Sequence, residues 1–230
     1  MNSQAFEPVI GLEIHAQLLT KTKLFCGCST RYGSSPNSLT CPVCLGLPGA
    51  LPVLNREAMV MAVKLGLALK AKIHPWSVFS RKNYFYPDLP KGYQITQYHS
   101  PFATDGYLEL DGNRTSKTIG IARLNLEEDA AKSIHDGMAD SSQKTYLDFN
   151  RSGIPLLEIV GKPEMNSPQE AVEFLQLLRT ILHYLEICDG NMEEGNLRCD
   201  ANLSVRKKDA VELGVKVEVK NLNSFRFLQK

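Results

Sequence analysis

The chain has 230 residues, of which 43% are hydrophobic and 22% are charged, which excludes a disordered, collagen-like or coiled-coil protein. Its formal net charge of +1 argues against a protein whose main task is to grip nucleic-acid backbone, because such proteins are usually distinctly basic. The sequence has no run of about 18 apolar residues and no signal peptide. We therefore expect no membrane span and a location in the cytoplasm, or in an organelle matrix if a transit segment was removed.

The first expected element is a strand over residues 8–18, because polar and apolar residues alternate there. The alternation places Glu13 and His15 side by side on the polar face, about 7 Å apart at Cα by the strand rise. A carboxylate and an imidazole placed in this way can belong to a binding site or to a solvated strand face.

Four of the six cysteines follow this strand with the spacing Cys26-x-Cys28-x12-Cys41-x2-Cys44. Tetrahedral zinc takes four thiolates, and two turns joined by a short loop can bring such cysteines together. We therefore predict a structural zinc site in the loop over residues 24–47, with no open coordination position for catalysis. A redox pair or thiols without metal are the alternatives.

A helix is predicted from about Arg56 to Leu69, with Asn55 as its N-cap. The segment over residues 81–97 contains two prolines and a glycine, so we expect a loop between strands there. Its Lys and Arg residues are interleaved with tyrosines, a combination that suits base stacking and phosphate contact. A packed surface loop with half-buried tyrosines is the alternative reading of the same segment.

Two carboxylates in the middle of the chain stand where apolar side chains are expected. A β-hairpin is predicted from strands over residues 107–110 and 117–126 with an Asp-Gly turn at 111–112, and alternation places Glu128 on its apolar face. Glu158 interrupts the apolar run of a second strand–turn–strand unit. Such carboxylates are costly to bury unless they are paired or bound to a metal, or unless the strand has already ended.

The last third of the sequence predicts a helix from the Ser167 cap to about Leu185, strands over residues 197–205 and 215–219, and a helix capped by Asn221 or Asn223. The row of polar side chains on the first of these strands includes Asp200. The chain ends one turn into the last helix, so we expect it to be a fragment of a longer protein.

Charge and motif content together favour one class of chemistry. Residues 63–123 hold nine Lys and Arg against four Asp and Glu, whereas residues 124–200 hold six against fifteen, although two differently charged solvated surfaces would give the same counts. There is no P-loop, no dinucleotide-binding glycine motif and no hydrolase motif. Scattered carboxylates, a histidine and basic residues are the inventory of Mg²⁺-assisted phosphoryl transfer without a P-loop.

The sequence resembles the family formed by the B subunit of aspartyl/glutamyl-tRNA amidotransferases. The motifs that carry this resemblance follow the family's order along nearly the whole chain; they are Val9–His15, Arg81–Asp88, Tyr93–Gln97, Leu126–Asp129, Pro155–Val160, Met192–Gly195, Leu197–Asn202 and Lys220–Phe225. The resemblance implies an α+β fold, a cradle on an antiparallel sheet similar to glutamine synthetase and guanido kinases, with the cysteine loop as an insertion. It also implies that residues 1–230 form the catalytic domain, and that a helical domain and a tRNA-binding tail follow in the full protein.

The activity implied by the resemblance is the second half of indirect aminoacylation. Glutamate misloaded on the glutamine tRNA, and possibly aspartate on the asparagine tRNA, is activated by ATP as an acyl phosphate, and ammonia then displaces the phosphate. The ammonia would come from an amidase-family glutaminase partner, the A subunit, and a small C subunit would complete a heterotrimer. Alternatives are a zinc-bearing RNA-binding module without catalysis and an ATP-dependent amidation of a free amino acid.

Carried over by position, the resemblance assigns Mg²⁺ binding to Glu13, His15, Glu128 and Glu158. It makes Arg81 and Lys82 candidates for steadying the ATP phosphates, and Asp200 a candidate for the ammonia path or the substrate. We therefore expect Glu128, and not its neighbour Glu127, to be the ligand from that pair.

Overall fold

The computed structural model describes residues 6–111, 116–137, 140–208 and 210–230. Its main element is a seven-stranded sheet in which every neighbouring pair of strands is antiparallel, which confirms the predicted antiparallel α+β class. In spatial order the strands are β11 (Val217–Val219), β10 (Leu197–Lys207), β1 (Phe6–Gln17), β9 (Pro155–Gly161), β6 (Lys117–Glu128), β5 (Ala103–Leu110) and β2 (Lys72–Ile73).

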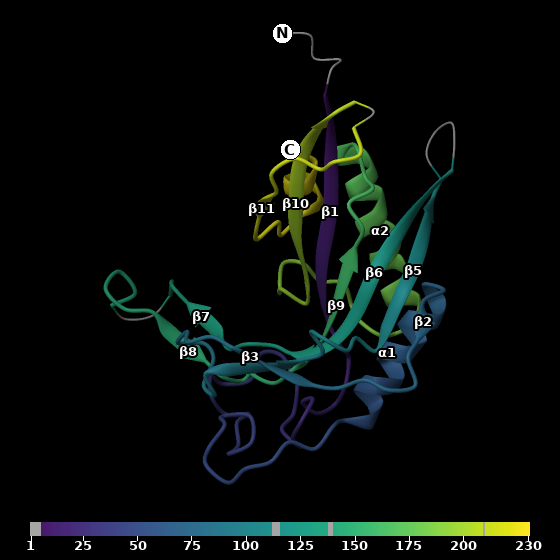
Figure 1. Ribbon diagram of the computed structural model, residues 1–230. Coiled ribbons are helices and arrows are strands. Elements are labelled where there is room, and N and C mark those ends of the chain that lie inside the picture. The colour runs from purple at the N-terminus through teal and green to yellow at the C-terminus, as the bar shows by residue number, and fades with distance from the viewer. Residues whose placement is uncertain (1–5, 112–115, 138–139, 209) are drawn as a thin grey trace.

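One face of this sheet is apolar and covered by helices (Figure 1). The alternation in β1 places Leu12, Ile14 and Ala16 on this face, and all three are buried. Burial of such a face removes apolar area from water at roughly 25 cal/mol per Å². The covering helices are α1 (Arg56–Ala68), α2 (Pro168–Tyr184) and the short α3 (Phe225–Gln229).

The helices begin where polar caps satisfy their first backbone N–H groups. Asn55 accepts hydrogen bonds from the N–H groups of Glu57 and Ala58, as predicted for α1. Ser167 accepts from the N–H of Glu170 and caps α2, which also confirms the prediction. The prediction for α3 was wrong by a few residues: its cap is Ser224, and neither of the two preceding asparagines.

Two small hairpins stand apart from the main sheet. Strands β3 (Ser80–Asn83) and β4 (Tyr93–Thr96) pair with each other, as do β7 (Lys132–Ile134) and β8 (Tyr146–Asp148). The prediction of a loop over residues 81–97 was therefore wrong at both ends. The prolines and the glycine all lie in the connection between β3 and β4, so they leave the flanking residues free to pair.

The segment over residues 145–160 also differs from the expected strand–turn–strand unit. Its two strands, β8 and β9, do not pair with each other; β8 pairs with β7 in the projecting hairpin, and β9 lies between β1 and β6 in the main sheet. The hairpin of β5 and β6 was predicted correctly, although residue 112 of its turn lies outside the described residues. No helix in the described part of the chain is long and apolar enough to span a membrane.

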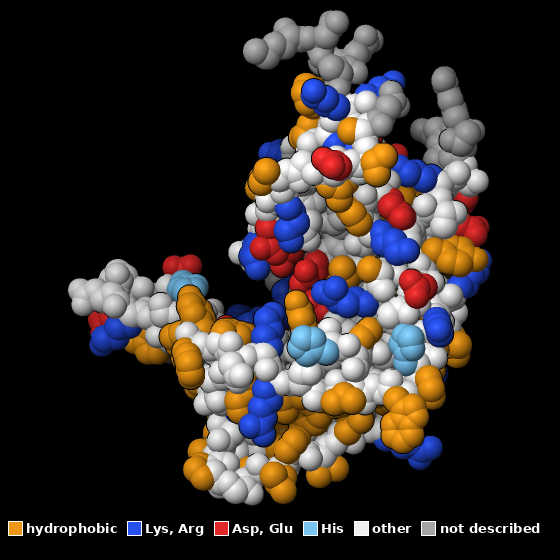
Figure 2. All heavy atoms as spheres, in the orientation of Figure 1, with side chains coloured by type: hydrophobic (Ala, Val, Ile, Leu, Met, Phe, Trp, Pro, Cys, Tyr) orange, Lys and Arg blue, Asp and Glu red, His pale blue; other side chains and the backbone are white. Residues whose placement is uncertain are grey.

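The second face of the main sheet carries the polar side chains of β1 and β10, and no helix among the described residues covers it. Figure 2 shows a hollow between the sheet and the projecting β7–β8 hairpin, in which acidic and basic side chains gather. The fold thus has an apolar side that stabilises it and a polar side that is available for a site.

Leu178 tests the role of the helix-covered face. Its side chain is fully buried in α2 against the sheet, so Leu178→Ala should lower the free energy of unfolding by about 2–5 kcal/mol through lost contacts and a cavity. Gln176→Ala is the matched control, because Gln176 is exposed on the same helix, and it should change stability by less than about 0.5 kcal/mol. Denaturant unfolding measures both, and equal effects would contradict the assigned packing of α2.

Candidate functional site

The polar face of the sheet brings side chains from four strands into one row. The strand register pairs His15 of β1 with Arg198 of β10 and with Glu158 of β9, and it pairs Glu158 with Asn125 of β6. Directly opposed residues of this kind have Cβ atoms about 4.5–5.5 Å apart. A guanidinium, an imidazole, a carboxylate and an amide therefore meet at one level of the sheet, although they are far apart in the sequence.

Two members of this row, together with Glu13 of β1, could hold a metal ion. Glu13, His15 and Glu158 each offer one ligand atom, and these atoms all lie within 4.8 Å of one another. The Nε2 atom of His15 lies 3.7 Å from Oε1 of Glu13, and Glu158 accepts a hydrogen bond from the amide of Asn125. Two carboxylates and an imidazole in a half-buried cluster suit a divalent cation such as Mg²⁺ or Mn²⁺.

The electrostatics of the cluster favour a bound cation. Burial raises the pKa of Glu13, and the neighbouring carboxylates of Glu158 and Asp200 raise it further. Among the described residues, no Lys or Arg forms an ion pair with Glu13 or Glu158. The Oδ1 atom of Asn125 is buried, and none of the described residues donates a hydrogen bond to it. A divalent cation would relieve the repulsion between the carboxylates, so the residues present fit such an ion.

His15 is poised to act as a neutral ligand. Burial lowers the pKa of His15, and the adjacent Arg198 lowers it further. The imidazole therefore keeps a free lone pair at neutral pH, which metal binding requires.

The two glutamates at the end of β6 point in opposite directions. Oε1 of Glu127 lies 3.5 Å from Nε2 of His15, so Glu127 borders the cluster. Glu128 instead forms an ion pair with Lys91 and accepts a hydrogen bond from the N–H of Ile95 at 3.0 Å. The structure therefore does not bring Glu128 to the other three expected ligands. The alternation along β6 contained this information, because it placed Glu127 on the polar face.

Asp129, a buried carboxylate that the sequence analysis did not single out, holds the guanidinium of Arg198 in place. Oδ1 of Asp129 lies 3.0 Å from Nη2 of Arg198, Oδ2 lies 3.9 Å from Nε of Arg151, and Oδ2 accepts a 2.7 Å hydrogen bond from Gln17. Burial acts to raise the pKa of Asp129, but Arg198 and Arg151 outweigh it and hold that pKa below its usual range. Asp129 stays ionised and holds Arg198 beside His15.

The remaining predicted site residues are Asp200, Lys82 and Arg81, and each has a different contact. Asp200 lies opposite Glu13 in the strand register and accepts a hydrogen bond from the N–H of Asn221 at 3.0 Å. Lys82, which is exposed on β3, is close enough to Glu127 to influence its titration. Arg81 is directed to the ring of Tyr93, with its Cζ atom 4.7 Å from the ring centre.

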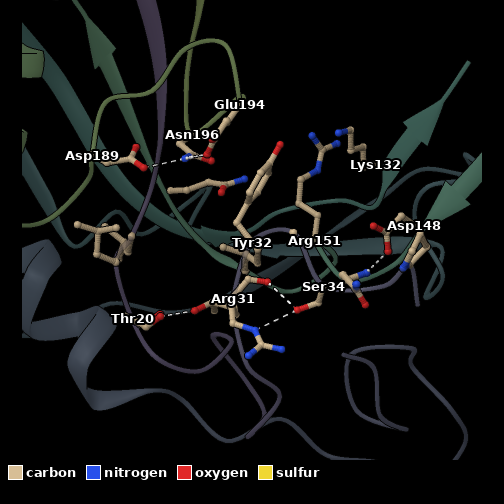
Figure 3. A pocket seen from close by; sticks show the side chains of 18 of the residues that line it. Thr20, Arg31, Tyr32, Ser34, Lys132, Asp148, Arg151, Asp189, Glu194 and Asn196 are labelled. Atoms are coloured by element: carbon tan, nitrogen blue, oxygen red, sulfur yellow. Dashed lines mark hydrogen bonds between the residues drawn. The ribbon is translucent and has the colours of Figure 1, made fainter. Parts of the chain in front are cut away.

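A cavity of about 490 Å³ opens beside the row. Gln17 belongs to both, since it lines the cavity and also donates to Asp129. Figure 3 shows Tyr32 projecting into the space, with Arg151 and Lys132 on one side and Asp189, Glu194 and Asn196 on the other. The cavity combines an aromatic ring with both signs of charge, and it is large enough for a small organic group.

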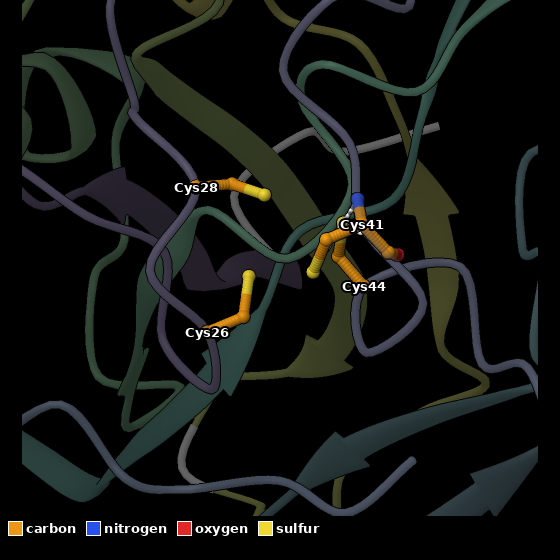
Figure 4. Close-up of side chains that lie close together, drawn as sticks. All are labelled: Cys26, Cys28, Cys41 and Cys44. Atoms are coloured by element: carbon orange, nitrogen blue, oxygen red, sulfur yellow. Dashed lines mark hydrogen bonds between the residues drawn. The ribbon is translucent and has the colours of Figure 1, made fainter. Parts of the chain in front are cut away.

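The four clustered cysteines converge from two loops, as Figure 4 shows. Their sulfur atoms lie within 4.8 Å of one another, and the Sγ atoms of Cys41 and Cys44 are 3.9 Å apart. Tetrahedral zinc with Zn–S bonds of about 2.3 Å requires S···S separations of about 3.8 Å, whereas a disulfide requires about 2.0 Å. The N–H of Cys41 also donates to Sγ of Cys44 at 3.2 Å. The cluster is consistent with a zinc knuckle, and its residues fit that ion.

Comparison with known proteins gives a uniform result. A family model described as the GatB/GatE catalytic domain matches residues 8–230. The chain is 59% identical over 225 residues to a protein of Thermodesulfovibrio yellowstonii named as the B subunit of aspartyl/glutamyl-tRNA(Asn/Gln) amidotransferase, covering 98% of this chain and 46% of the relative. Relatives with the same name are 55% identical in Desulfotalea psychrophila (97% of this chain, 47% of the relative) and 56% identical in Helicobacter pylori (98% and 46%). The chain thus spans about half the length of these relatives.

Zinc binding can be tested by metal analysis. The protein should bind about one Zn²⁺ per chain, and Cys41→Ser should lower this content and the thermal midpoint, because one of four ligands is lost. Cys188→Ala is the control, since Cys188 is a buried cysteine outside the cluster; it should retain zinc. A wild-type protein that contains no zinc and whose midpoint is unchanged by a chelator would contradict the zinc assignment.

Glu127 should make stability depend on pH. Burial, followed by the charge of Glu158, raises the pKa of Glu127 to about 8 from an ordinary value of 4.5. Between these values the folded chain holds a proton that the unfolded chain has lost, so this group's contribution to stability falls as pH rises from 4.5 to 8. Glu127→Gln should therefore match the wild type near pH 4 and exceed it at pH 8 by about 1–4 kcal/mol without divalent cations.

The measurement is denaturant unfolding at a series of pH values. Glu109→Gln serves as the control, because Glu109 is exposed on β5 and its substitution should give a difference that does not vary with pH. A flat difference for Glu127→Gln as well would show that the carboxyl of Glu127 is not held in its protonated form.

Proposed function

Because this chain belongs to the GatB/GatE catalytic-domain family, we propose that it activates the side-chain carboxylate of a misacylated tRNA for amidation. In this proposal ATP phosphorylates the glutamate carried by the glutamine tRNA, and ammonia then displaces the phosphate to leave glutaminyl-tRNA. Aspartyl-tRNA for asparagine is a second candidate substrate, since the relatives are named for both. The observation that carries the proposal is the cluster of Glu13, His15 and Glu158, which no Lys or Arg of the described residues neutralises by an ion pair.

The roles of the residues follow from their positions. Glu13, His15 and Glu158 would hold Mg²⁺, with Glu127 beside them. When bound, Mg²⁺ would neutralise charge between the ATP phosphates and the substrate carboxylate, two anions that otherwise repel each other. Lys82, which is exposed on β3 and acts electrostatically on Glu127, would steady the transferring phosphoryl group.

Arg81, Asp200 and the neighbouring cavity have further proposed roles. Arg81 would contact the ATP phosphates after leaving the ring of Tyr93, and Asp200 would face ammonia or the substrate beside Glu13. The cavity lined by Tyr32 and Arg151 would receive the aminoacyl end of the tRNA, because it opens next to the cluster and offers an aromatic face and cations. A role for Glu128 as a metal ligand remains a prediction, and it would require Glu128 to leave Lys91.

The proposal extends to the whole protein. Residues 1–230 would form a catalytic cradle similar to those of glutamine synthetase and guanido kinases, with residues 24–47 as a zinc-binding insertion, and helical and tRNA-binding domains would complete the chain. An amidase-family glutaminase subunit would supply the ammonia, and a small third subunit would complete a heterotrimer. We propose that this complex acts in the bacterial cytoplasm or in an organelle matrix.

Glu158→Gln is the substitution that tests this function. It keeps the shape of the side chain but removes the charge that a cation needs, so phosphorylation of the tRNA-bound glutamate should fall by about 10³-fold or more in the full complex. The glutaminase activity of the partner, assayed separately, should persist at least in part. Near-normal transamidation by this variant would remove Glu158 from the mechanism.

Matched substitutions make the result specific. Glu109→Gln, an exposed change on β5, should leave activity unaltered. Glu127→Gln and Glu128→Gln, assayed in parallel, identify which of the two neighbours supports the chemistry. A larger loss of activity is expected for Glu127→Gln, because Glu127 lies 3.5 Å from His15.

The two alternative functions predict different results. A non-catalytic RNA-binding module shows no ATP hydrolysis with misacylated tRNA, and an amidase for a free amino acid is active without tRNA.

A further inference from the structure

Lys23 is a lysine enclosed in the protein interior. Its exposed fraction is 0%, and it is among the largest of the fully buried side chains in the described part of the chain. Among the described residues, no carboxylate forms an ion pair with it. A buried ammonium is costly unless an opposite charge lies nearby, so the position of Lys23 favours an anionic partner other than a paired carboxylate.

The contacts of Lys23 point to the cysteine centre as that partner. Its Nζ atom lies 3.6 Å from Sγ of Cys44 and donates a 3.2 Å hydrogen bond to the carbonyl of Phe149. A carbonyl oxygen carries no net charge, so the Phe149 contact does not balance the ammonium. The sulfur of Cys44 is therefore the group that can balance the ammonium.

The charge of a four-cysteine zinc centre matches this requirement. Zn²⁺ contributes two positive charges and four thiolates contribute four negative charges, so the centre carries a net charge of −2. One lysine ammonium in contact with a ligating sulfur halves that excess. Outer-shell partners of this kind orient metal ligands and tune the centre.

We infer that Lys23 is the charge-compensating residue of the zinc centre and that it fastens this centre to the connection between β8 and β9. This inference rests on the zinc site proposed above. It assigns Lys23 a positioning role, because its ammonium contacts a ligand sulfur and the chain that leads to the candidate active site.

The connection that Lys23 holds, residues 149–153, leads directly to that site. The N–H of Leu24 donates to the carbonyl of Gly153 at 2.9 Å, so the backbone next to Lys23 is also tied to this segment. Arg151, in the middle of the segment, donates to the carbonyls of Ala130 and Ala131 at 2.9 and 2.6 Å. Arg151 also lies 3.9 Å from Asp129, which orients Arg198. The zinc centre is thus linked through Lys23 to the carboxylate at the end of the polar row.

Gly153 lies where this connection meets the side chains of Lys23 and Cys44. Its φ of +86° lies in the left-handed region, which favours glycine. A Cβ atom at this position would lie 3.4 Å from the side chains of both Lys23 and Cys44. The lysine, the cysteine and the connection therefore lie in van der Waals contact range of one another at this glycine.

The test compares Lys23→Met, which has similar length without charge, with Lys23→Arg, which keeps the charge. Lys21→Met is the matched control, because Lys21 is exposed two residues away on the same loop. Zinc affinity of the intact protein is measured by competition with a chromophoric chelator. Lys23→Met should weaken zinc binding by about 10- to 100-fold, Lys21→Met should leave it unchanged, and Lys23→Arg should lose less than Lys23→Met.

A second readout separates charge compensation from simple packing. Lys23→Met should lower the thermal midpoint of the zinc-loaded protein more than that of the zinc-free protein, because the ammonium faces the dianionic centre only while zinc is bound. Equal shifts in both forms, with unchanged zinc affinity, would overturn the inference, since Lys23 would then contribute only the packing of its aliphatic chain. A wild-type protein without zinc affinity would instead remove the zinc proposal itself.

Should Lys23→Met fail to fold, the wild-type protein still decides the question. Hydrogen exchange at the backbone amides of residues 149–153 should become faster when zinc is removed, because the link through Lys23 is weakened. Unchanged protection of this connection, with zinc demonstrably lost, would overturn the proposed coupling.

Discussion

The antiparallel register of β1 between β9 and β10 is the constraint on which the candidate site depends. It places His15 opposite both Glu158 and Arg198, and Glu13 opposite Asp200. A shift of one residue would turn these side chains to the helix-covered face and expose Leu12, Ile14 and Ala16, so the apolar core fixes the register. The packing that stabilises the fold therefore also assembles the polar row, whose members come from distant parts of the sequence.

Charge balance explains why the site has its composition. Three of the charged groups in or near the interior have identified partners: Asp129 has Arg198 and Arg151, Glu128 has Lys91, and Lys23 contacts Cys44. In the described part of the chain, the carboxylates of the Glu13–Glu158 cluster have no such cationic side chain in contact. Burial and mutual repulsion raise the pKa of Glu13 there, which is the physical cost that a divalent cation would relieve. A chain of contacts through Lys23, the connection that contains Arg151, and Asp129 links the cysteine centre to Arg198, which lies next to the cluster.

Local sequence patterns predicted the features that depend on local physics. Alternation identified β1, a capping asparagine marked the start of α1, and the apolar stripe identified α2. The anomaly of Glu158 within an apolar strand singled out a residue that the structure places beside Glu13 and His15, whereas the grouping of these three came from the family resemblance. The convergence of the four cysteines followed from their spacing, because two short turns are enough to bring them together.

Other features depend on contacts that spacing does not encode. The pairing of β8 with β7, and not with β9, is set by tertiary packing, as is the partnership of Asp129 with Arg198. The choice of Glu128 over Glu127 was made from the family resemblance and from the anomaly of Glu128 on an apolar face. That anomaly has a different cause, since Lys91 balances its charge locally, and Glu127 occupies the polar face beside His15. The buried Lys23 gave no signal in the sequence, because its burial results from the folding of the cysteine loop onto the chain after β8.

The divalent cation proposed for the cluster can be observed directly. The measurement is the anomalous scattering of Mn²⁺ in crystals of the intact protein, with Glu158→Gln crystals as the comparison. We expect a peak within about 2.0–2.6 Å of carboxylate oxygens of Glu13 and Glu158, and its loss in the variant. Mn²⁺ bound elsewhere in the protein, with no peak between Glu13, His15 and Glu158, would contradict the assignment of this cluster as the metal site.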